Sequence, residues 1–395
     1  MSSDAPPPAD VPDEATTSLL SAAASHDLAR LTLLLKTHPA TLQHPITLTT
    51  PLHAAVASLS PSASDTEVTA AEDTVRLLLQ NGAIWNDLDA NGETPGCVAW
   101  RLGGSVKELY ELLVEAGVRA ELLMGRLGGG WDALASDSES EAEDGEKDVT
   151  SSQYLDSSLH YDDAKLLDAD DNGVMMAWEA KIMQRSVAEL LPTGATGKRV
   201  LNVGFGMGIV DSAFQERLRE MWGEDEDVRH TIVEAHPDVL KKLRQDGWYE
   251  KRGVEVLEGR WQEVFPYPKN PTPNKQLTRQ ALAPIIAAGT TFDAIYFDTF
   301  AEEYTALKEF FTEYVLALLS PDGGRFSFFH GLGADRRVSW DVYTRVVELD
   351  LLEAGLDTIW TDVEIELPEQ TWTGVRRRYW DVGGVYRLPV CTFVG

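Results

Sequence analysis

Short apolar runs alternate with amphipathic stretches through the second half of the chain. The stretches, such as DSAFQERLREMWG and PDVLKKLRQDGW, carry apolar residues at helical spacing. Strands that alternate with helices predict a parallel sheet covered on both faces, joined by right-handed crossovers into a doubly wound α/β fold. The runs expected to be strands are VLNVGFG (200–206), HTIVEAH (230–236), VEVLEG (254–259), FDAIYFD (292–298) and GRFSFFHG (324–331).

The chain before residue 130 has a different pattern, because its apolar positions recur only at helical spacing. Gly82 and Gly117 stand where a helix favours a left-handed residue at its C-terminal end. Shorter helices are expected to begin at the Thr-Pro pairs of TTPLHAA (49–55) and NGETPGCVA (91–99). The longer predicted helices lie in DLARLTLLLKTHP (27–39), TVRLLLQNGA (74–83) and VKELYELLVEAGV (106–118).

These paired helices resemble ankyrin repeats, whose signature is T-P-L-H-x-A. Residues 50–55 match it fully, whereas the second copy has Gly96 and Cys97 in place of Leu and His. An insertion between the copies, SLSPSASDTEVTA (58–70), is expected to be a loop. His53 is expected to bond the repeat turn rather than to act in catalysis. The resemblance implies an all-α domain over residues 15–130, of a kind that usually binds protein.

An acidic segment separates the two patterns. Residues 132–148, DALASDSESEAEDGEKD, carry eight acids and one lysine and present no apolar face. This composition predicts a disordered linker over residues 131–153, followed by a second domain over 154–395. Serines beside the acids could be phosphorylated, but a solvated spacer is the simpler interpretation.

Charge and cysteine content exclude several classes of function. The formal net charge of −30 disfavours direct nucleic-acid binding and favours a basic protein partner. Cys97 and Cys391 form no CxxC pair, so we expect no disulfide framework and no metal, and the usage suits a reducing compartment. We also expect no signal peptide, no membrane span and a monomeric protein.

Three glycines follow the first predicted strand, in RVLNVGFGMGIV (199–210). A dinucleotide fingerprint starting at Gly204 would need glycine at position 209, where Ile209 stands, so NAD is disfavoured. Glu234 ends the next strand, where a carboxylate can accept the ribose hydroxyls of an adenosine. Strand, glycines, helix, strand and terminal acid together favour an adenosine-type ligand, although a tight strand–helix turn would explain the glycines alone.

This combination resembles the S-adenosylmethionine-dependent methyltransferases. Five segments in order resemble guanidinoacetate methyltransferase: GVMMAWEAKIM (173–183), VGFGMGIV (203–210), IVEAHPDVL (232–240), GRWQEV (259–264) and FDAIYFDTF (292–300). With the ankyrin-like region, the chain is similar to the type IV protein arginine methyltransferases of fungi and plants. That resemblance implies transfer of one methyl group to the delta (internal) guanidino nitrogen of an arginine. It also implies a substrate among large-subunit ribosomal proteins, and a location in cytoplasm and nucleus.

The resemblance also implies a cofactor site for S-adenosylmethionine at the ends of the strands. An aromatic residue would cap the cofactor; its spacing indicates Tyr154, with Tyr161 as the alternative. Two methionines would close over it, although core packing is their simpler role. The implied cofactor residues are Tyr154, Met175, Met183, Gly204, Phe205, Gly206, Met207, Gly208, Ile209, Val210, Glu234, Ala235, His236, Gly259, Arg260, Trp261 and Asp298.

Two carboxylates carry the chemistry in the small-molecule relative, and they match Glu179 and Asp298 here. A guanidinium spreads its charge over three nitrogens, so carboxylates bonded to its terminal nitrogens would hold the charge there. The internal nitrogen could then attack the methyl group. Glu302 or Glu303 is an alternative or a third carboxylate, and a solvated helix residue or a strand-end cap is the structural alternative for the pair.

The residues leave the substrate open. The small-molecule relative recognises a free carboxylate on its substrate, which an arginine within a protein lacks. The alternatives are a methyltransferase acting on guanidinoacetate, a non-enzymatic ankyrin adaptor and an NAD-dependent oxidoreductase. The three arginines of TGVRRRYWDVGG (373–384) are expected to be solvated on an edge strand. The proline-rich loop PYPKNPTPNK (266–275) could line the substrate approach.

Overall fold

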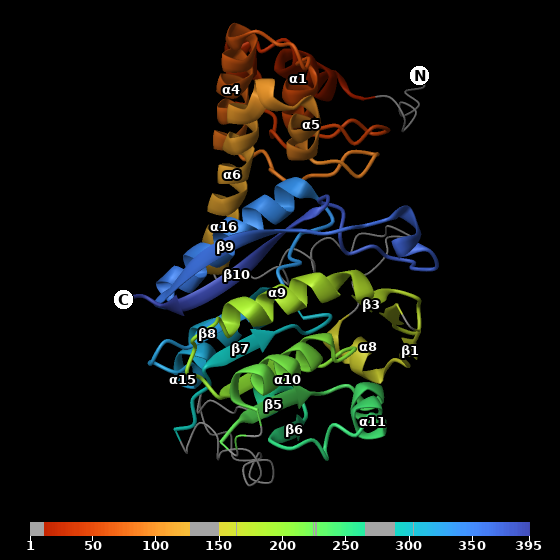
Figure 1. Ribbon diagram of the computed structural model, residues 1–395. Coiled ribbons are helices and arrows are strands. Elements are labelled where there is room, and N and C mark those ends of the chain that lie inside the picture. The colour runs from red at the N-terminus through yellow and green to blue at the C-terminus, as the bar shows by residue number, and fades with distance from the viewer. Residues whose placement is uncertain are drawn as a thin grey trace, which may run out of the picture. The chain divides into compact units, whose positions relative to one another are not determined.

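The computed structural model forms two compact units (Figure 1). Unit 1 contains Met1–Ser138 and Gly333–Val346, and unit 2 contains Glu139–Leu332 and Val347–Gly395. The acidic segment 132–148 and the loop 266–275 lie outside the described residues. The structure describes residues 12–126, 150–162, 164–223, 225, 227–264, 289–302 and 304–395.

Unit 1 is built from helices that stack in two layers. Helices α1, α3 and α5 contact one another in succession, and α2, α4 and α6 do the same. This pairing fits the expected repeats, whose assignment as ankyrin repeats stays a prediction. The bounds are α1 Glu14–Ala24, α2 Leu28–Leu34, α3 Pro51–Ala57, α4 Asp65–Gln80, α5 Pro95–Leu102, η1 Gly104–Val106 and α6 Lys107–Arg126.

His53 connects successive loops of unit 1. Its Nδ1 lies 2.8 Å from Thr50 Oγ1 at the N-cap of α3, and its Nε2 lies 2.9 Å from the carbonyl oxygen of Glu93. Burial lowers the pKa of this imidazole, which favours its neutral form. The structural role expected for His53 is therefore confirmed.

Two sequence expectations for unit 1 are wrong. The segment 58–70 is not all loop, because α4 begins at Asp65, where Ser64 and Glu67 form a capping box. Gly117 does not end a helix, because α6 continues to Arg126. A Cβ atom on Gly117 would lie 2.6 Å from Val342 Cγ2, so this glycine permits close packing within the unit.

Unit 2 contains a seven-stranded sheet with the order β6-β5-β4-β7-β8-β10-β9. The strands from β6 to β8 are parallel, and β10 is antiparallel to both of its neighbours. The five predicted strands are confirmed as β4 Arg199–Val203, β5 Arg229–Glu234, β6 Val254–Glu258, β7 Ala294–Phe297 and β8 Arg325–Phe328. Two strands complete the sheet, β9 Leu356–Glu364 and β10 Val385–Phe393.

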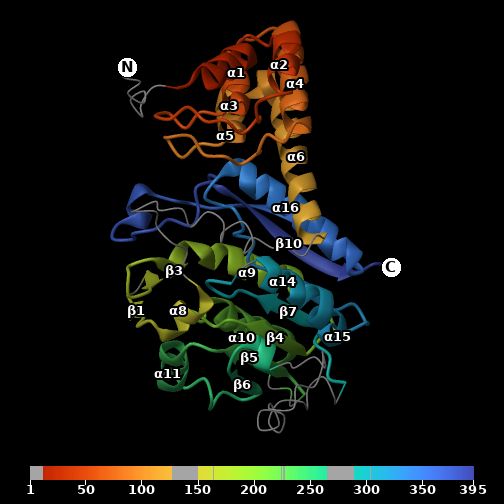
Figure 2. The same cartoon turned by 180° about the vertical axis from the view of Figure 1, so that it is seen from behind.

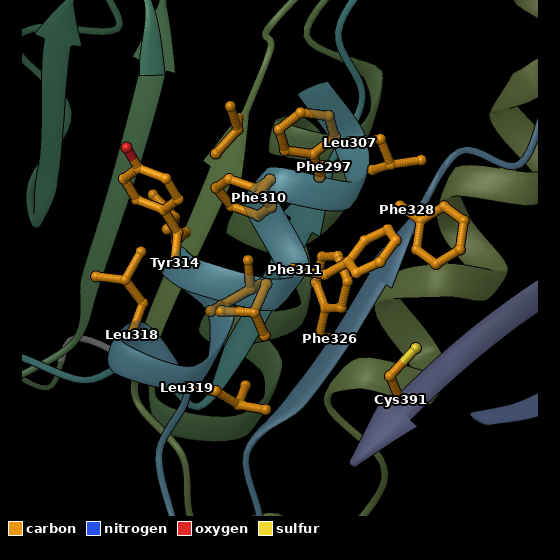
Figure 3. Packing of buried hydrophobic residues seen from close by; sticks show 14 of the residues in the cluster. Phe297, Leu307, Phe310, Phe311, Tyr314, Leu318, Leu319, Phe326, Phe328 and Cys391 are labelled. Carbon is orange, nitrogen blue, oxygen red and sulfur yellow. The ribbon is translucent and has the colours of Figure 1, made fainter. Parts of the chain in front are cut away.

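Helices cover both faces of this sheet. In Figure 1, α9 and α10 lie in front of the strands, and in Figure 2, α14 and α15 lie in front. The aromatic side chains of Phe310, Phe311, Phe326 and Phe328 fill the core on the second face (Figure 3). This three-layer arrangement is Rossmann-like. The helix bounds are α9 Ala180–Leu190, α10 Ile209–Trp222, α11 Pro237–Gln245, α12 Trp261–Val264, α14 Tyr304–Glu309, η4 Phe310–Val315, α15 Leu316–Leu318 and α16 Arg337–Glu353.

Smaller elements precede and follow the sheet in the chain. Helix α8 begins at Ser151, close to the expected domain start at 154. A three-stranded antiparallel sheet follows it and leads into α9. The bounds are α8 Ser151–Asp156, β1 His160–Tyr161, β2 Lys165–Leu167, β3 Gly173–Met176, η2 Ala177–Glu179 and η5 Glu369–Trp372.

Candidate functional site

A pocket opens at the carboxyl ends of β4, β5 and β7, where open α/β sheets bind nucleotides. Ten residues expected to bind the cofactor line it: Tyr154, Met175, Gly204, Gly206, Glu234, Ala235, Gly259, Arg260, Trp261 and Asp298. Residues without a prior expectation also line it, including Ser151, Thr299 and Phe300, together with Glu302. The segments quoted for the family resemblance therefore converge on one pocket.

The other expected cofactor residues are buried in the surrounding cores or pack against them. Met183, Phe205 and Val210 are almost fully buried in the two cores that flank the glycine loop. Met207 and Ile209 pack against one of those cores, and Gly208 and His236 are buried beside the loop and β5. None of these seven is among the described residues that line the pocket.

All three loop glycines have positive φ, at 92° for Gly204, 54° for Gly206 and 71° for Gly208. All three make room for the protein itself. A Cβ atom on Gly204 would meet the backbone of Asp298, one on Gly206 the side chain of Met175, and one on Gly208 the ring of Phe205. Only Gly204 and Gly206 of the three line the pocket. Closeness to the ligand therefore explains only part of the glycine requirement.

Glu234 is buried at the end of β5 and is bonded by backbone N–H groups. The N–H groups of Ala235 and His236 each donate to Oε1 at 2.7 Å, and that of Phe205 donates to Oε2 at 2.9 Å. Burial raises the pKa of this carboxyl, and the backbone donors oppose that shift. Glu234 also lines the pocket, so its carboxylate is the acceptor expected there for ribose hydroxyls.

Helix α8 brings Tyr154 to the pocket. His236 Nε2 lies 3.0 Å from the carbonyl oxygen of Tyr154, and Arg260 donates to Ser151 Oγ at 3.0 Å. The Tyr154 ring packs edge-on against Phe300, with 4.9 Å between ring centroids. Tyr161 instead donates to the carbonyl oxygen of Gly206 at 3.3 Å and does not line the pocket. The geometry thus favours Tyr154 as the capping aromatic residue.

Glu302 lines the pocket and is held there by its neighbours. Trp261 Nε1 donates to both of its oxygens, at 3.0 and 2.9 Å. Gln262 Nε2 and Thr299 Oγ1 donate to it as well, at 3.1 and 2.7 Å. These four donor contacts fix the turn beside Trp261. Glu303 lies outside the described residues.

Glu179 and Asp298 form a carboxylate pair beside the pocket. Glu179 is 2% exposed, and Asp298 Oδ2 is a buried acceptor without a hydrogen-bond partner among the described residues. Burial raises the pKa of both carboxyls, and the charge of Asp298 raises that of Glu179 further. Asp298 as a whole is half-buried, because it also lines the pocket. Two interacting carboxylates of this kind are stabilised by a cationic ligand that supplies several N–H donors.

Sequence reasoning missed Tyr379. Its hydroxyl donates to Glu179 Oε1, and its ring stacks on Trp178 with 6.1 Å between centroids. Tyr379 directly follows the three arginines of 376–378, which are exposed as expected but lie in a loop and not on an edge strand. Only the structure shows this contact, because the two partners lie 200 positions apart in the sequence.

An S-adenosylmethionine molecule fits the polar groups of this pocket. Glu234 places a carboxylate on the pocket for the ribose hydroxyls, and Met175, Tyr154 and Trp261 offer apolar surface. Among the described residues, no cluster of three or more His, Cys, Asp or Glu is placed to hold a metal ion. No helix in the described ranges is long and apolar enough to span a membrane.

The chain is similar in sequence to several known proteins. The sequence profile of guanidinoacetate N-methyltransferase matches residues 142–276. Protein arginine N-methyltransferase 2 of Aspergillus fumigatus is 44% identical, over 95% of this chain and 96% of its own length. The Saccharomyces cerevisiae protein of the same name is 37% identical, over 87% of this chain and 83% of its own. Among solved structures, SAH-bound Podospora anserina methyltransferase PaMTH1 is 14% identical, over 55% of this chain and 78% of its own, with a TM-score of 0.32.

Proposed function

The chain belongs to the protein arginine N-methyltransferase 2 family, and we propose that it is an arginine methyltransferase of type IV. Its cofactor is S-adenosylmethionine. In this proposal one methyl group is placed on the internal (delta) guanidino nitrogen of an arginine within a protein. The observation that carries it is the buried Glu179 beside the half-buried Asp298, whose Oδ2 is buried and has no partner among the described residues.

The two carboxylates recognise the guanidinium by charge and shape. Each accepts hydrogen bonds from one terminal nitrogen, and this charge-assisted pairing draws positive charge toward those two atoms. The internal nitrogen loses delocalisation and regains lone-pair character. Both carboxyls must be ionised for this, and the guanidinium itself supplies the charge that overcomes their raised pKa values.

Bound S-adenosylmethionine supplies an activated methyl group on a sulfonium. The chain's own task is to orient the nucleophile and exclude water. Glu234 anchors the ribose, and the Gly204–Gly206 turn and Met175 lie along the same pocket. Asp298 lines this pocket and also interacts electrostatically with Glu179. It therefore lies between the proposed cofactor site and the proposed guanidinium site. Alignment of the two reacting atoms is the largest contribution expected of the protein.

A basic protein is the proposed substrate. The net charge of −30 attracts such a partner and speeds its encounter. We place the substrate among large-subunit ribosomal proteins, and the activity in cytoplasm and nucleus, on the strength of the family resemblance alone. Helical unit 1 is the proposed recruitment element, because stacked helical repeats present broad surfaces for protein binding.

The experiment compares three substrates for labelled methyl transfer: isolated large-subunit ribosomal proteins, free arginine and guanidinoacetate. We expect transfer to protein and none to the two small molecules. Glu179→Gln and Asp298→Asn should each lower kcat about 10²-fold. Asp341→Asn, which removes a buried carboxylate in unit 1, is the matched control. Methylation of guanidinoacetate alone would replace this proposal with a small-molecule methyltransferase.

A further inference from the structure

We infer that Tyr379 is a positioning residue, which occupies one oxygen of Glu179 and leaves only the other for the substrate guanidinium. This inference rests on the proposed function, because it specifies how the same site selects the internal nitrogen. It starts from the two donors that bind Glu179. The Tyr379 hydroxyl and the Met176 N–H, at 2.8 Å, both donate to Oε1. Within the described residues, Oε2 receives neither.

The occupied oxygen matters because carboxylates usually bind guanidinium groups through both oxygens at once. One such fork engages a terminal nitrogen together with the internal nitrogen. That arrangement would tie up the atom that must attack the methyl group. With Oε1 already holding two donors, Glu179 can offer Oε2 to one terminal nitrogen only. Asp298 Oδ2 is then the acceptor for the other terminal nitrogen.

The Tyr379 ring is held firmly enough for this task. It stacks on Trp178 at an interplanar angle of 29° and meets Trp372 edge-on, with 5.2 Å between centroids. A Cβ atom on Gly173 would lie 2.9 Å from Tyr379 Cε1, so glycine at this hairpin position makes room for the ring. The ring is therefore confined on several sides while its hydroxyl faces Glu179.

Backbone contacts anchor the loop that carries Tyr379. Lys165 Nζ donates to the carbonyl oxygen of Thr373 at 2.6 Å, and the Arg376 N–H donates to that of Asp171 at 2.8 Å. Lys165 lies on β2, and Asp171 lies in the turn between β2 and β3. Both contacts join the loop to the hairpin that leads directly into Glu179. Tyr379 and its carboxylate partner are thus fixed to the same frame.

The test is Tyr379→Phe, which removes one hydroxyl and keeps the packed ring. We expect kcat to fall about tenfold and methyl groups to reach terminal nitrogens that the wild-type protein leaves unmodified. The control is Tyr110→Phe, because Tyr110 is buried and donates to the buried Asp341 at 2.5 Å in unit 1. That variant loses an equivalent hydrogen bond, and its kcat and product should match the wild type.

A double variant separates this inference from the proposed function. If Tyr379 acts through Glu179, then Tyr379→Phe combined with Glu179→Gln should be no slower than Glu179→Gln alone. Multiplied effects, or a Tyr379→Phe product and kcat like those of Tyr110→Phe, would overturn the positioning role and leave the type IV proposal intact. Terminal methylation by the wild-type protein would instead overturn the type IV proposal, whatever the variants do.

Discussion

A Cβ atom on Gly204 would lie 1.8 Å from the carbonyl oxygen of Asp298. The glycine loop and the strand end that carries the proposed catalytic aspartate therefore touch backbone to backbone. This contact is possible because β4 and β7 are neighbours in the sheet, with Val203 paired to Phe297. This one backbone contact therefore fixes the proposed cofactor loop relative to the proposed catalytic carboxylate.

Gly204→Ala should unfold more easily than the wild type and lose most activity. The added Cβ cannot move away from backbone, so β4 and β7 must separate. Gly194→Ala is the matched control, because its φ is 89° and a Cβ there meets nothing within 4 Å. That control carries only the strain of positive φ, about 1 kcal/mol. Urea unfolding should show a larger loss in the free energy of unfolding for Gly204→Ala than for Gly194→Ala. Equal losses would mean that the contact with Asp298 does not exclude a side chain at position 204.

The sequence predicted the central strands and the end of β5 because these features are local. An apolar run, three glycines and a terminal acid stand within one stretch, and Glu234 does lie on the pocket. Tyr379 and β10 could not be found in this way, because their partners lie far along the chain. The extent of α4 was missed for a different reason: the Ser64–Glu67 capping box was not recognised within a polar segment.

Glu234→Gln should weaken S-adenosylmethionine binding by about 1–3 kcal/mol. The amide keeps one acceptor oxygen but turns an NH₂ group toward backbone N–H donors that now bond both carboxylate oxygens. Glu258→Gln is the control, because Glu258 pairs with Glu234 in the β5–β6 register and does not line the pocket. Calorimetry should show weaker S-adenosylmethionine binding in Glu234→Gln than in Glu258→Gln. An unchanged affinity in Glu234→Gln would show that Glu234 does not bind the cofactor.

Activity and stability should respond to pH in opposite directions. Burial raises the pKa of Glu179 and of Asp298, so kcat/KM on the arginine substrate should rise with pH, with its acid limb above the ordinary carboxylate range of about 4. A raised pKa in the folded protein means that protonation stabilises the fold. The contribution of Glu179 to stability is therefore present at low pH and lost as pH rises through its folded pKa.

Thermal unfolding of wild type and Glu179→Gln at several pH values isolates the contribution of Glu179 to stability. The other acidic residues are common to both proteins, so their effects cancel in the difference. The variant should gain stability relative to wild type as pH rises, because it has no buried charge to form. A constant difference between the two proteins across that range would show that Glu179 is not shifted. If both carboxyls instead have ordinary pKa values, the acid limb of the wild-type rate profile should lie at about pH 4.

Deleting residues 1–138 should destabilise Gly333–Val346, the later segment of the chain that belongs to unit 1. Val338 and Val342 are fully buried, and they pack against Gly96 and Gly117. Without these partners, both valines become exposed at the start of α16. We expect faster proteolysis between residues 333 and 346 in the shortened protein. Protection equal to that of the full chain would show that this segment does not depend on the helices of unit 1.

The position of the methyl group on the product arginine tests the central claim most directly. Digested substrate protein would be fragmented in a mass spectrometer after transfer from labelled S-adenosylmethionine. Two carboxylates that hold the terminal nitrogens leave only the internal nitrogen to react, so we predict a single methyl group there. Methyl groups on terminal nitrogens of the wild-type product would contradict the roles given to Glu179 and Asp298.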